Sequence, residues 1–162
     1  DGNGRVGRLM ITLYLVENDL LSRPALYLSD YLEKNRDAYY RHLTEIREKN
    51  EMIPWIKFFL KGVIVTAENA KNTFIKIIEL QKEMETRLRS FGSRAEKINS
   101  IINAFYESPI LSVKDTVAKT GIPDKTTRNL LELMREDNLI KEMTGYERNR
   151  LFIFEKYFNL FK

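Results

Sequence analysis

The sequence predicts a mainly α-helical fold that ends with a small β-hairpin. Through most of the chain, apolar residues recur at spacings of three and four, which is the period of an amphipathic helix. Near the C-terminus this period gives way to two short runs, residues 139–142 and 150–154, on either side of Thr144-Gly145-Tyr146. Two such runs around a glycine-containing turn are typical of antiparallel strands.

Three helices are expected in the first third of the chain, over residues 4–18, over residues 26–34 and from about residue 37 onwards. In the first of them, apolar positions three and four residues apart predict one buried stripe. The members of this stripe are Val6, Leu9, Leu13 and Val16.

A long helix is expected over residues 54–90. Pro54 suits its first turn, where the missing backbone N–H leaves no helical hydrogen bond unmade. The apolar spacing that follows resembles the seam of a coiled coil. Phe91-Gly92-Ser93 is the best linker candidate, which divides the chain into a first domain of residues 1–90 and a second of residues 91–162.

The second domain is expected to contain helices over residues 95–106, 113–120 and 124–137, followed by the two strands. Gly121-Ile122-Pro123 forms a tight turn before the last helix, which Asp124 is expected to cap. This order of helices, turn and hairpin is that of a winged helix-turn-helix. An aromatic tail is expected to form the core of this domain or its contact with the long helix: Phe152, Phe154, Tyr157, Phe158 and Phe161.

Composition narrows the class of protein. The 162 residues carry a formal net charge of +4, which permits a nucleotide or nucleic-acid partner but is also ordinary for a soluble surface. The absence of cysteine excludes disulfides and thiolate metal sites, and it suits a reducing cytoplasm. The most apolar stretch, residues 53–65, is interrupted by Lys57 and Lys61 and falls short of the roughly 20 apolar residues that span a bilayer. We therefore expect a cytoplasmic protein with no membrane partner.

The first eight residues are the most informative stretch of the sequence. Gly2 and Gly4 can adopt backbone angles closed to other residues, so consecutive N–H groups can converge on one anion. The start of the following helix adds a partial positive charge. Arg5 and Arg8 are three residues apart and can project from one helical face toward the same anion, and Asp1 can hold Mg²⁺. A simple helix start with solvated arginines is the alternative, but the combination of residues in one register favours a phosphate site.

Asp1-Gly2-Asn3-Gly4-Arg5-Val6-Gly7-Arg8 resembles the second half of the Fic signature, His-Pro-Phe-x-Asp/Glu-Gly-Asn-Gly-Arg-x-x-Arg, at every specified position. Segments further along are similar to those that follow this motif in bacterial Fic proteins with a C-terminal winged helix. These segments are Leu26-Tyr27-Leu28-Ser29-Asp30-Tyr31, Asn35-Arg36-Asp37-Ala38-Tyr39-Tyr40, Trp55 and Phe58-Phe59-Leu60. The resemblance covers essentially the whole chain, with residues 1–90 as the C-terminal part of a Fic domain.

The resemblance implies a protein adenylyltransferase that transfers AMP from Mg-ATP to a Ser, Thr or Tyr hydroxyl of a target protein. Asp1 would bind Mg²⁺, and Asn3, Arg5 and Arg8 would support the transition state. The nucleotide-binding residues implied by the resemblance are Gly2, Asn3, Gly4, Arg5, Val6, Gly7 and Arg8, together with Tyr40 at the adenosine pocket and Arg47 at its border. AMP is the expected group because the Gly-Asn-Gly-Arg pattern is intact; other branches of the family move UMP, phosphocholine or phosphate.

The resemblance also places the catalytic histidine before Asp1, outside this chain, so the chain alone is expected to be inactive. That histidine would be the general base for the incoming hydroxyl. His42 is the single histidine present and is expected to be structural or solvent-facing. An inhibitory Ser/Thr-x-x-x-Glu-Gly/Asn helix is not found, so such a helix is expected upstream or on a separate protein.

DNA binding by the second domain is the alternative function. The expected recognition helix begins with residue types that contact phosphates and base edges, and two arginines lie near the expected wing. These candidates are Lys125, Thr126, Thr127, Arg128 and Asn129, with Arg148 and Arg150. Interleaved acidic residues argue instead for a packing or interaction module. The aromatic tail also leaves a homodimer open, because aromatic residues are common in interface cores.

Overall fold

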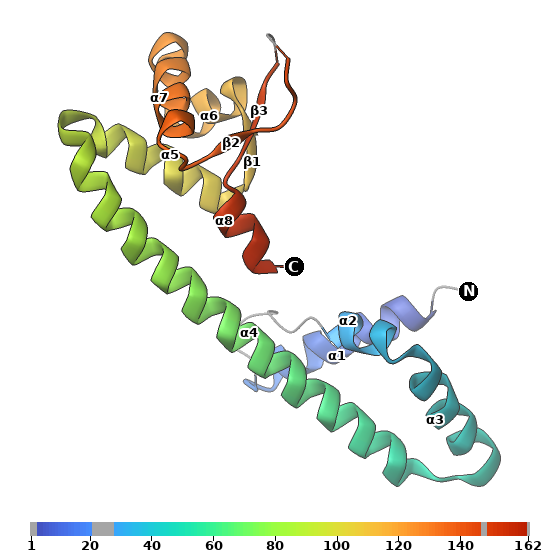
Figure 1. Cartoon of the computed structure of the whole chain (residues 1–162). Helices are drawn as coiled ribbons and strands as arrows, with labels where there is room; N and C mark the ends of the chain where they lie inside the picture. Colours follow the sequence, from blue (N-terminus) through green and yellow to red (C-terminus); the bar gives the residue numbers. More distant parts are fainter. Residues whose placement is uncertain (1–2, 21–27, 147–148, 162) are drawn as a thin grey trace. The chain divides into compact units, whose positions relative to one another are not determined.

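The computed structural model describes residues 3–20, 28–146 and 149–161 of the chain (Figure 1). It is mainly helical and contains a small antiparallel sheet, which confirms the expected mainly α class. The chain separates into two compact units, Asp1–Asn72 and Thr73–Lys162, and the long helix α4 (Met52–Leu88) contributes to both. The predicted division at residues 90 and 91 lies further along, where Gly92 adopts a φ of 54° inside the 3₁₀ helix η1 (Arg89–Arg94).

The first unit consists of α1 (Asn3–Glu17), α2 (Leu28–Lys34), α3 (Arg36–Lys49) and the first part of α4. Leu28 and Leu32, both on α2, are its buried apolar centre. Gly62 on α4 allows a close approach, because a Cβ there would lie 2.6 Å from the ring of Tyr31 on α2. The side chains packed around the two leucines are Ile11, Leu15, Tyr31, Tyr39, Phe58, Phe59 and Val63.

The predicted buried stripe of α1 is wrong. Of its four members, Val6, Leu9 and Leu13 are each more than half exposed, and Val16 is half-buried. Ile11 and Leu15, also four residues apart, pack against the α2 leucines instead. Helix α1 carries two apolar stripes of the same period, and the period alone does not decide which of them faces the neighbouring helix.

The second unit begins with the last part of α4 and continues through α5 (Ala95–Glu107), β1 (Ile110–Ser112), α6 (Val113–Thr120) and α7 (Asp124–Glu136). It closes with β2 (Lys141–Glu142), β3 (Leu151–Ile153), α8 (Glu155–Phe158) and the 3₁₀ helix η2 (Asn159–Phe161). The three strands form an antiparallel sheet in the order β1-β3-β2, with helices beside it (Figure 1). The strand β1 was not predicted, since three residues are too few to show an alternating pattern.

The core of the second unit is larger than that of the first. Helices α5 and α7 both contribute side chains with no exposed surface to this core, including Ile101, Phe105 and Leu131. Phe152 and Phe154 are buried in the same core, which confirms the expectation for this part of the aromatic tail. Lys156 on α8 pairs with Glu83 on α4, so the tail also contacts the long helix as expected. Phe161, by contrast, is 59% exposed.

The two helices between β1 and β2 begin differently. Ser112 caps α6: its hydroxyl accepts a hydrogen bond from the Asp115 N–H at 3.1 Å, and the Asp115 carboxylate accepts from the Ser112 N–H at 3.0 Å. Hydrogen bonds from the Ser112 hydroxyl and N–H lower the pKa of Asp115. The predicted cap of α7 is wrong. Asp124 is the first helical residue, and its carboxylate binds Arg128 one turn later rather than the helix N–H groups.

Candidate functional site

The glycine-rich motif lies at the start of α1, which begins at Asn3. Asp1 and Gly2, and the side chains of Asn3, Arg5 and Arg8, lie outside the described residues. Helix α1 has 15 residues and no acidic residue in its first turn, so no carboxylate of its own neutralises the partial positive charge of its N-terminus. Gly4 is the second residue of this helix and does not lie in a turn before it.

Two further motif residues are described and both are open to solvent. Val6 is 58% exposed. Gly7 is exposed as well, and a Cβ added to it would meet no heavy atom within 4 Å. The packing of the described part of the first unit therefore does not require glycine at position 7.

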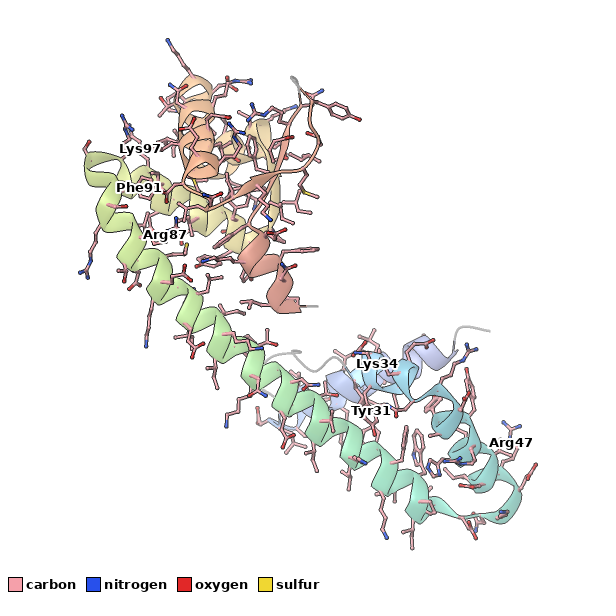
Figure 2. All side chains as sticks on the ribbon, in the orientation of Figure 1. Tyr31, Lys34, Arg47, Arg87, Phe91 and Lys97 are labelled. Atoms are coloured by element: carbon pink, nitrogen blue, oxygen red, sulfur yellow. The ribbon has the colours of Figure 1, made fainter. Side chains whose placement is uncertain are left out.

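The predicted adenosine contacts lie on α3. Tyr40 is 54% exposed; its ring packs edge-on against Tyr39 at 5.2 Å between centroids, and the Arg36 guanidinium lies 5.6 Å from its centre. Arg47 is exposed near the end of the same helix (Figure 2). Within the described part of the first unit, no hydrogen bond, ion pair or ring contact joins Tyr40 or Arg47 to α1. Tyr40 is thus an accessible aromatic surface already stacked with one cation.

His42 takes the structural position that was expected. Its Nδ1 lies 2.9 Å from the Glu45 carboxylate one turn later, and its ring packs against Phe58 at 5.3 Å between centroids. His42 therefore helps to join α3 to α4.

The predicted recognition helix α7 offers fewer polar groups than its sequence indicates. Thr127 has no exposed surface, and its hydroxyl donates to the Ile122 carbonyl at 3.1 Å. It is a core residue and cannot reach a nucleic acid. Arg128 donates to Asp124 through Nε at 2.6 Å and through Nη2 at 3.2 Å. Lys125 and Asn129 are exposed, and Thr126 is half-buried.

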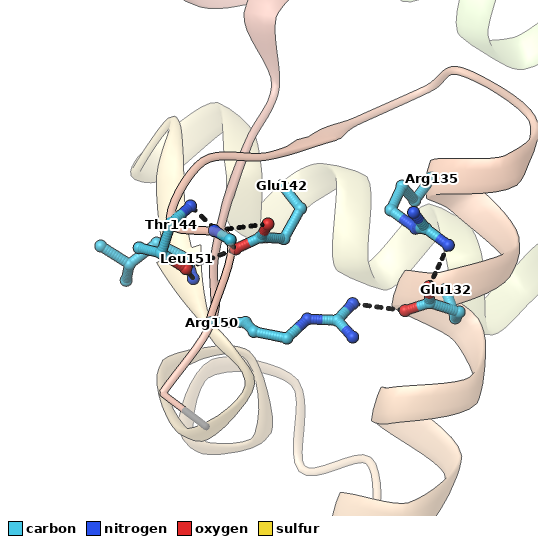
Figure 3. Close-up of polar contacts among 7 residues, drawn as sticks. Glu132, Arg135, Glu142, Thr144, Arg150 and Leu151 are labelled. Atoms are coloured by element: carbon cyan, nitrogen blue, oxygen red, sulfur yellow. Dashed lines mark hydrogen bonds and ion pairs between the residues drawn. The ribbon is translucent and has the colours of Figure 1, made fainter. Parts of the chain in front are cut away.

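Arg150 reaches from the start of β3 to α7, and Arg148 lies outside the described residues. The Arg150 guanidinium donates through Nη2 to Glu132, which Arg135 also binds (Figure 3). The hydrogen bond from Arg150 is the main reason that the pKa of Glu132 is lowered. The same guanidinium lies 5.0 Å from the centre of the Phe152 ring. Arg150 thus fixes the β3 end of the hairpin to α7.

Glu142 organises the turn that follows β2, a role that the sequence did not reveal. Its carboxylate accepts hydrogen bonds from the Thr144 hydroxyl, from the Thr144 N–H at 2.8 Å and from the Gly145 N–H at 2.9 Å (Figure 3). The bond from the Thr144 hydroxyl contributes most to the lowered pKa of Glu142. Gly145 has a φ of 65°, a conformation that favours glycine. Tyr146 follows this turn with 68% of its surface exposed.

A pocket of about 170 Å³ lies where the start of α6, one face of α7 and the start of β3 meet. Ser112, which caps α6, and Phe152, which stacks under Arg150, both contribute to its wall. Its other polar and charged lining residues are Lys114, Asp124, Arg128, Glu132, Asn149 and Arg150. Three of these were predicted only as surface contacts for DNA or as a helix cap; the fold brings them together around one cavity.

A comparison of the sequence with models of known protein families found no match. The helices that the structure describes include none with the length and apolarity needed to cross a membrane. Among the described residues, no three His, Cys, Asp or Glu side chains are grouped as metal ligands. The predicted Mg²⁺ ligand, Asp1, lies outside the described residues.

Proposed function

We propose that this chain is the C-terminal part of a Fic-type protein adenylyltransferase, which transfers AMP from Mg-ATP to a hydroxyl of a target protein. The observation that carries the proposal is the sequence Asp1–Arg8 at the start of helix α1. A helix N-terminus that contains Gly4 in its first turn and carries Arg5 and Arg8 further along has the donors and the charge that a triphosphate requires.

In the proposed reaction, the target hydroxyl oxygen forms a bond to the α-phosphorus of ATP, and the bond from that phosphorus to the bridging oxygen breaks. Pyrophosphate leaves, and the hydroxyl proton passes to the histidine that the resemblance places before Asp1. Asp1 would hold Mg²⁺, which would supply positive charge to the phosphates. The N–H groups of the glycine turn, with Arg5 and Arg8, would stabilise the charge on the leaving pyrophosphate.

The test is transfer of α-phosphate-labelled ATP onto protein by the full-length parent with Mg²⁺. We expect labelled protein in the wild type and loss of label in Arg5→Ala and Arg8→Ala. Each arginine contributes charge-assisted hydrogen bonds of about 1.5–3 kcal/mol, so ATP binding should weaken roughly 10- to 100-fold. Arg89→Ala is the matched control, because Arg89 is an exposed arginine outside the motif. Full transfer by the Arg8→Ala protein would contradict the proposal.

For the second unit, we propose a winged helix-turn-helix fold. The order α5, β1, α6, α7 and the antiparallel β2–β3 pair supports it, as do the capped start of α6 and the left-handed Gly121 that ends it. Exposed Lys125 and Asn129 on α7 favour nucleic-acid binding as a second candidate function. The pairing of Arg128 and Arg135 with carboxylates argues that any such contact is weaker than the residue types alone indicate.

A further inference from the structure

The pocket between α6, α7 and β3 is lined by charges from three separate segments. Lys114 lies in the first turn of α6, Arg128 lies on α7, and Arg150 precedes β3. Residues so far apart in sequence are brought together only by the fold of the second unit. Figure 3 shows the guanidinium of Arg150 extended toward Glu132 on α7.

The two carboxylates in the pocket wall are already neutralised. Asp124 accepts both of its close hydrogen bonds from Arg128, and Glu132 is bound by Arg135 as well as by Arg150. Lys114 acts on Asp115 through its charge but forms no salt bridge with a residue that the structure describes. The cations around the pocket therefore outnumber the carboxylates, and the excess charge is positive.

One N–H donor of the Arg150 guanidinium makes no hydrogen bond to the described residues. Its Nε is buried and has no acceptor among the described residues, although Nη2 is bonded to Glu132. The Phe152 ring, whose centre lies 5.0 Å from the guanidinium carbon, restricts the orientation of this planar group. A buried N–H without an acceptor is unfavourable, and a donor that carries positive charge is more so. An anion that binds this guanidinium from the pocket would offset that cost.

We propose that this pocket binds one phosphate group, through Arg150 and Lys114. A phosphate is favoured over a carboxylate because its tetrahedral oxygens reach donors from several directions, as the three walls of the pocket require. The group can come from free phosphate or from a nucleic-acid backbone. The proposal does not depend on AMP transfer, since it uses no residue of the N-terminal motif.

The first test uses the ¹⁵N–¹H NMR signal of the Arg150 side-chain Nε in the full chain, assigned by its loss in Arg150→Lys. We expect inorganic phosphate to shift this signal saturably. Lys114→Ala should weaken phosphate binding roughly fivefold, as for one partly exposed charge contact. Lys97→Ala is the control, because Lys97 is an exposed lysine on α5 outside the pocket (Figure 2). No shift with phosphate, an equal affinity for acetate, or an equal loss in both variants would each overturn the proposal.

The second test identifies the source of the phosphate, with binding of a labelled DNA duplex to the full chain measured across salt concentrations. If the pocket takes a backbone phosphate, Lys114→Ala should lower the slope of log affinity against log salt by about one, whatever the sequence of the duplex. If the duplex binds with the same slope in both proteins, the pocket is not a nucleic-acid contact, although the nucleic-acid candidate function stands. If no duplex binds, that candidate fails, and the phosphate titration alone decides the pocket.

Discussion

At the scale of single residues, two buried polar atoms lack hydrogen-bond partners among the described residues, and their chemistry differs. Arg150 Nε carries part of a charge and belongs to a side chain that lines a cavity, so an anion bound to this guanidinium can offset the cost of burying it. The Tyr106 hydroxyl is neutral and lies among aromatic rings, including Phe154 and Tyr157. Burial, with the charges of neighbouring ionisable groups, raises the pKa of Tyr106 to about 12. Of the two groups, the Tyr106 hydroxyl is the one whose removal should not destabilise the fold.

We therefore predict that Tyr106→Phe leaves the free energy of unfolding at pH 7 unchanged or raises it by up to about 1 kcal/mol, because an unpaired buried hydroxyl is removed while the ring contacts remain. The pKa of this group is higher in the folded protein than its ordinary value of 10.0. Below pH 10 this difference in pKa does not affect the free energy of unfolding of the wild type. As the pH rises from 10 toward about 12, the tyrosine ionises in the unfolded chain but not in the folded protein, so the wild type loses stability.

Urea unfolding at pH 7 and above pH 10 measures both effects, with Tyr146→Phe as the control at a 68% exposed tyrosine. The advantage of Tyr106→Phe over the wild type should be larger at the higher pH. A loss of more than 1 kcal/mol at pH 7 would show that the hydroxyl has a partner.

At the scale of elements, the boundaries of the helices were predictable where a residue has one dominant local effect. Gly121, with a φ of 69°, ends α6 where the sequence predicts a turn. The predicted cap at Asp124 is wrong because an Asp at a helix start can bind either the helix N–H groups or an arginine four residues later. The sequence does not show which of these partners is preferred. The cap of α6 was missed for a related reason: Ser112 lies in β1, a strand too short to be recognised.

The cap formed by Ser112 and Asp115 gives a prediction for α6. Ser112→Ala should lower the free energy of unfolding of the second unit by about 1 kcal/mol, since it removes the hydroxyl that accepts the Asp115 N–H. Ser112→Asp, which retains an acceptor, should recover part of that loss. Ser100→Ala is the control: this exposed serine bonds only within α5, and alanine favours the helix. Thermal unfolding of the three variants measures the difference, and equal effects of Ser112→Ala and Ser100→Ala would contradict a capping role.

At the scale of the whole chain, the mainly α class and the order of elements followed from periodicity, whereas the choice of buried face did not. Helix α1 shows why: its two apolar stripes have the same spacing, and only the position of Leu28 and Leu32 decides in favour of Ile11 and Leu15. The pocket was not predictable for the same reason, since Lys114 and Arg150 become neighbours only through tertiary packing. The motif at Asp1–Arg8 is the opposite case, because its residues are consecutive and their chemistry is readable without the fold.

The unequal cores of the two units predict separate unfolding. In the described residues, the first unit centres on two buried apolar side chains, Leu28 and Leu32, while the core cluster of the second unit contains seventeen. Since buried apolar area is the main favourable term in folding, the first unit should unfold at a lower urea concentration. Trp55 is the single tryptophan of the chain and packs against Tyr39 in the first unit, so its fluorescence reports that unit alone.

We expect the Trp55 fluorescence transition to precede the final part of the far-UV circular dichroism transition. Ile101→Val, in the core of the second unit, should lower stability by about 1 kcal/mol. With a slope of about 2 kcal/mol per molar urea, the later transition should move by roughly 0.5 M. The Trp55 transition should stay in place, because Ile101 belongs to the core cluster of the second unit and Trp55 lies in the first. Coincident transitions that move together in this variant would mean that α4 couples the two units into one cooperative fold.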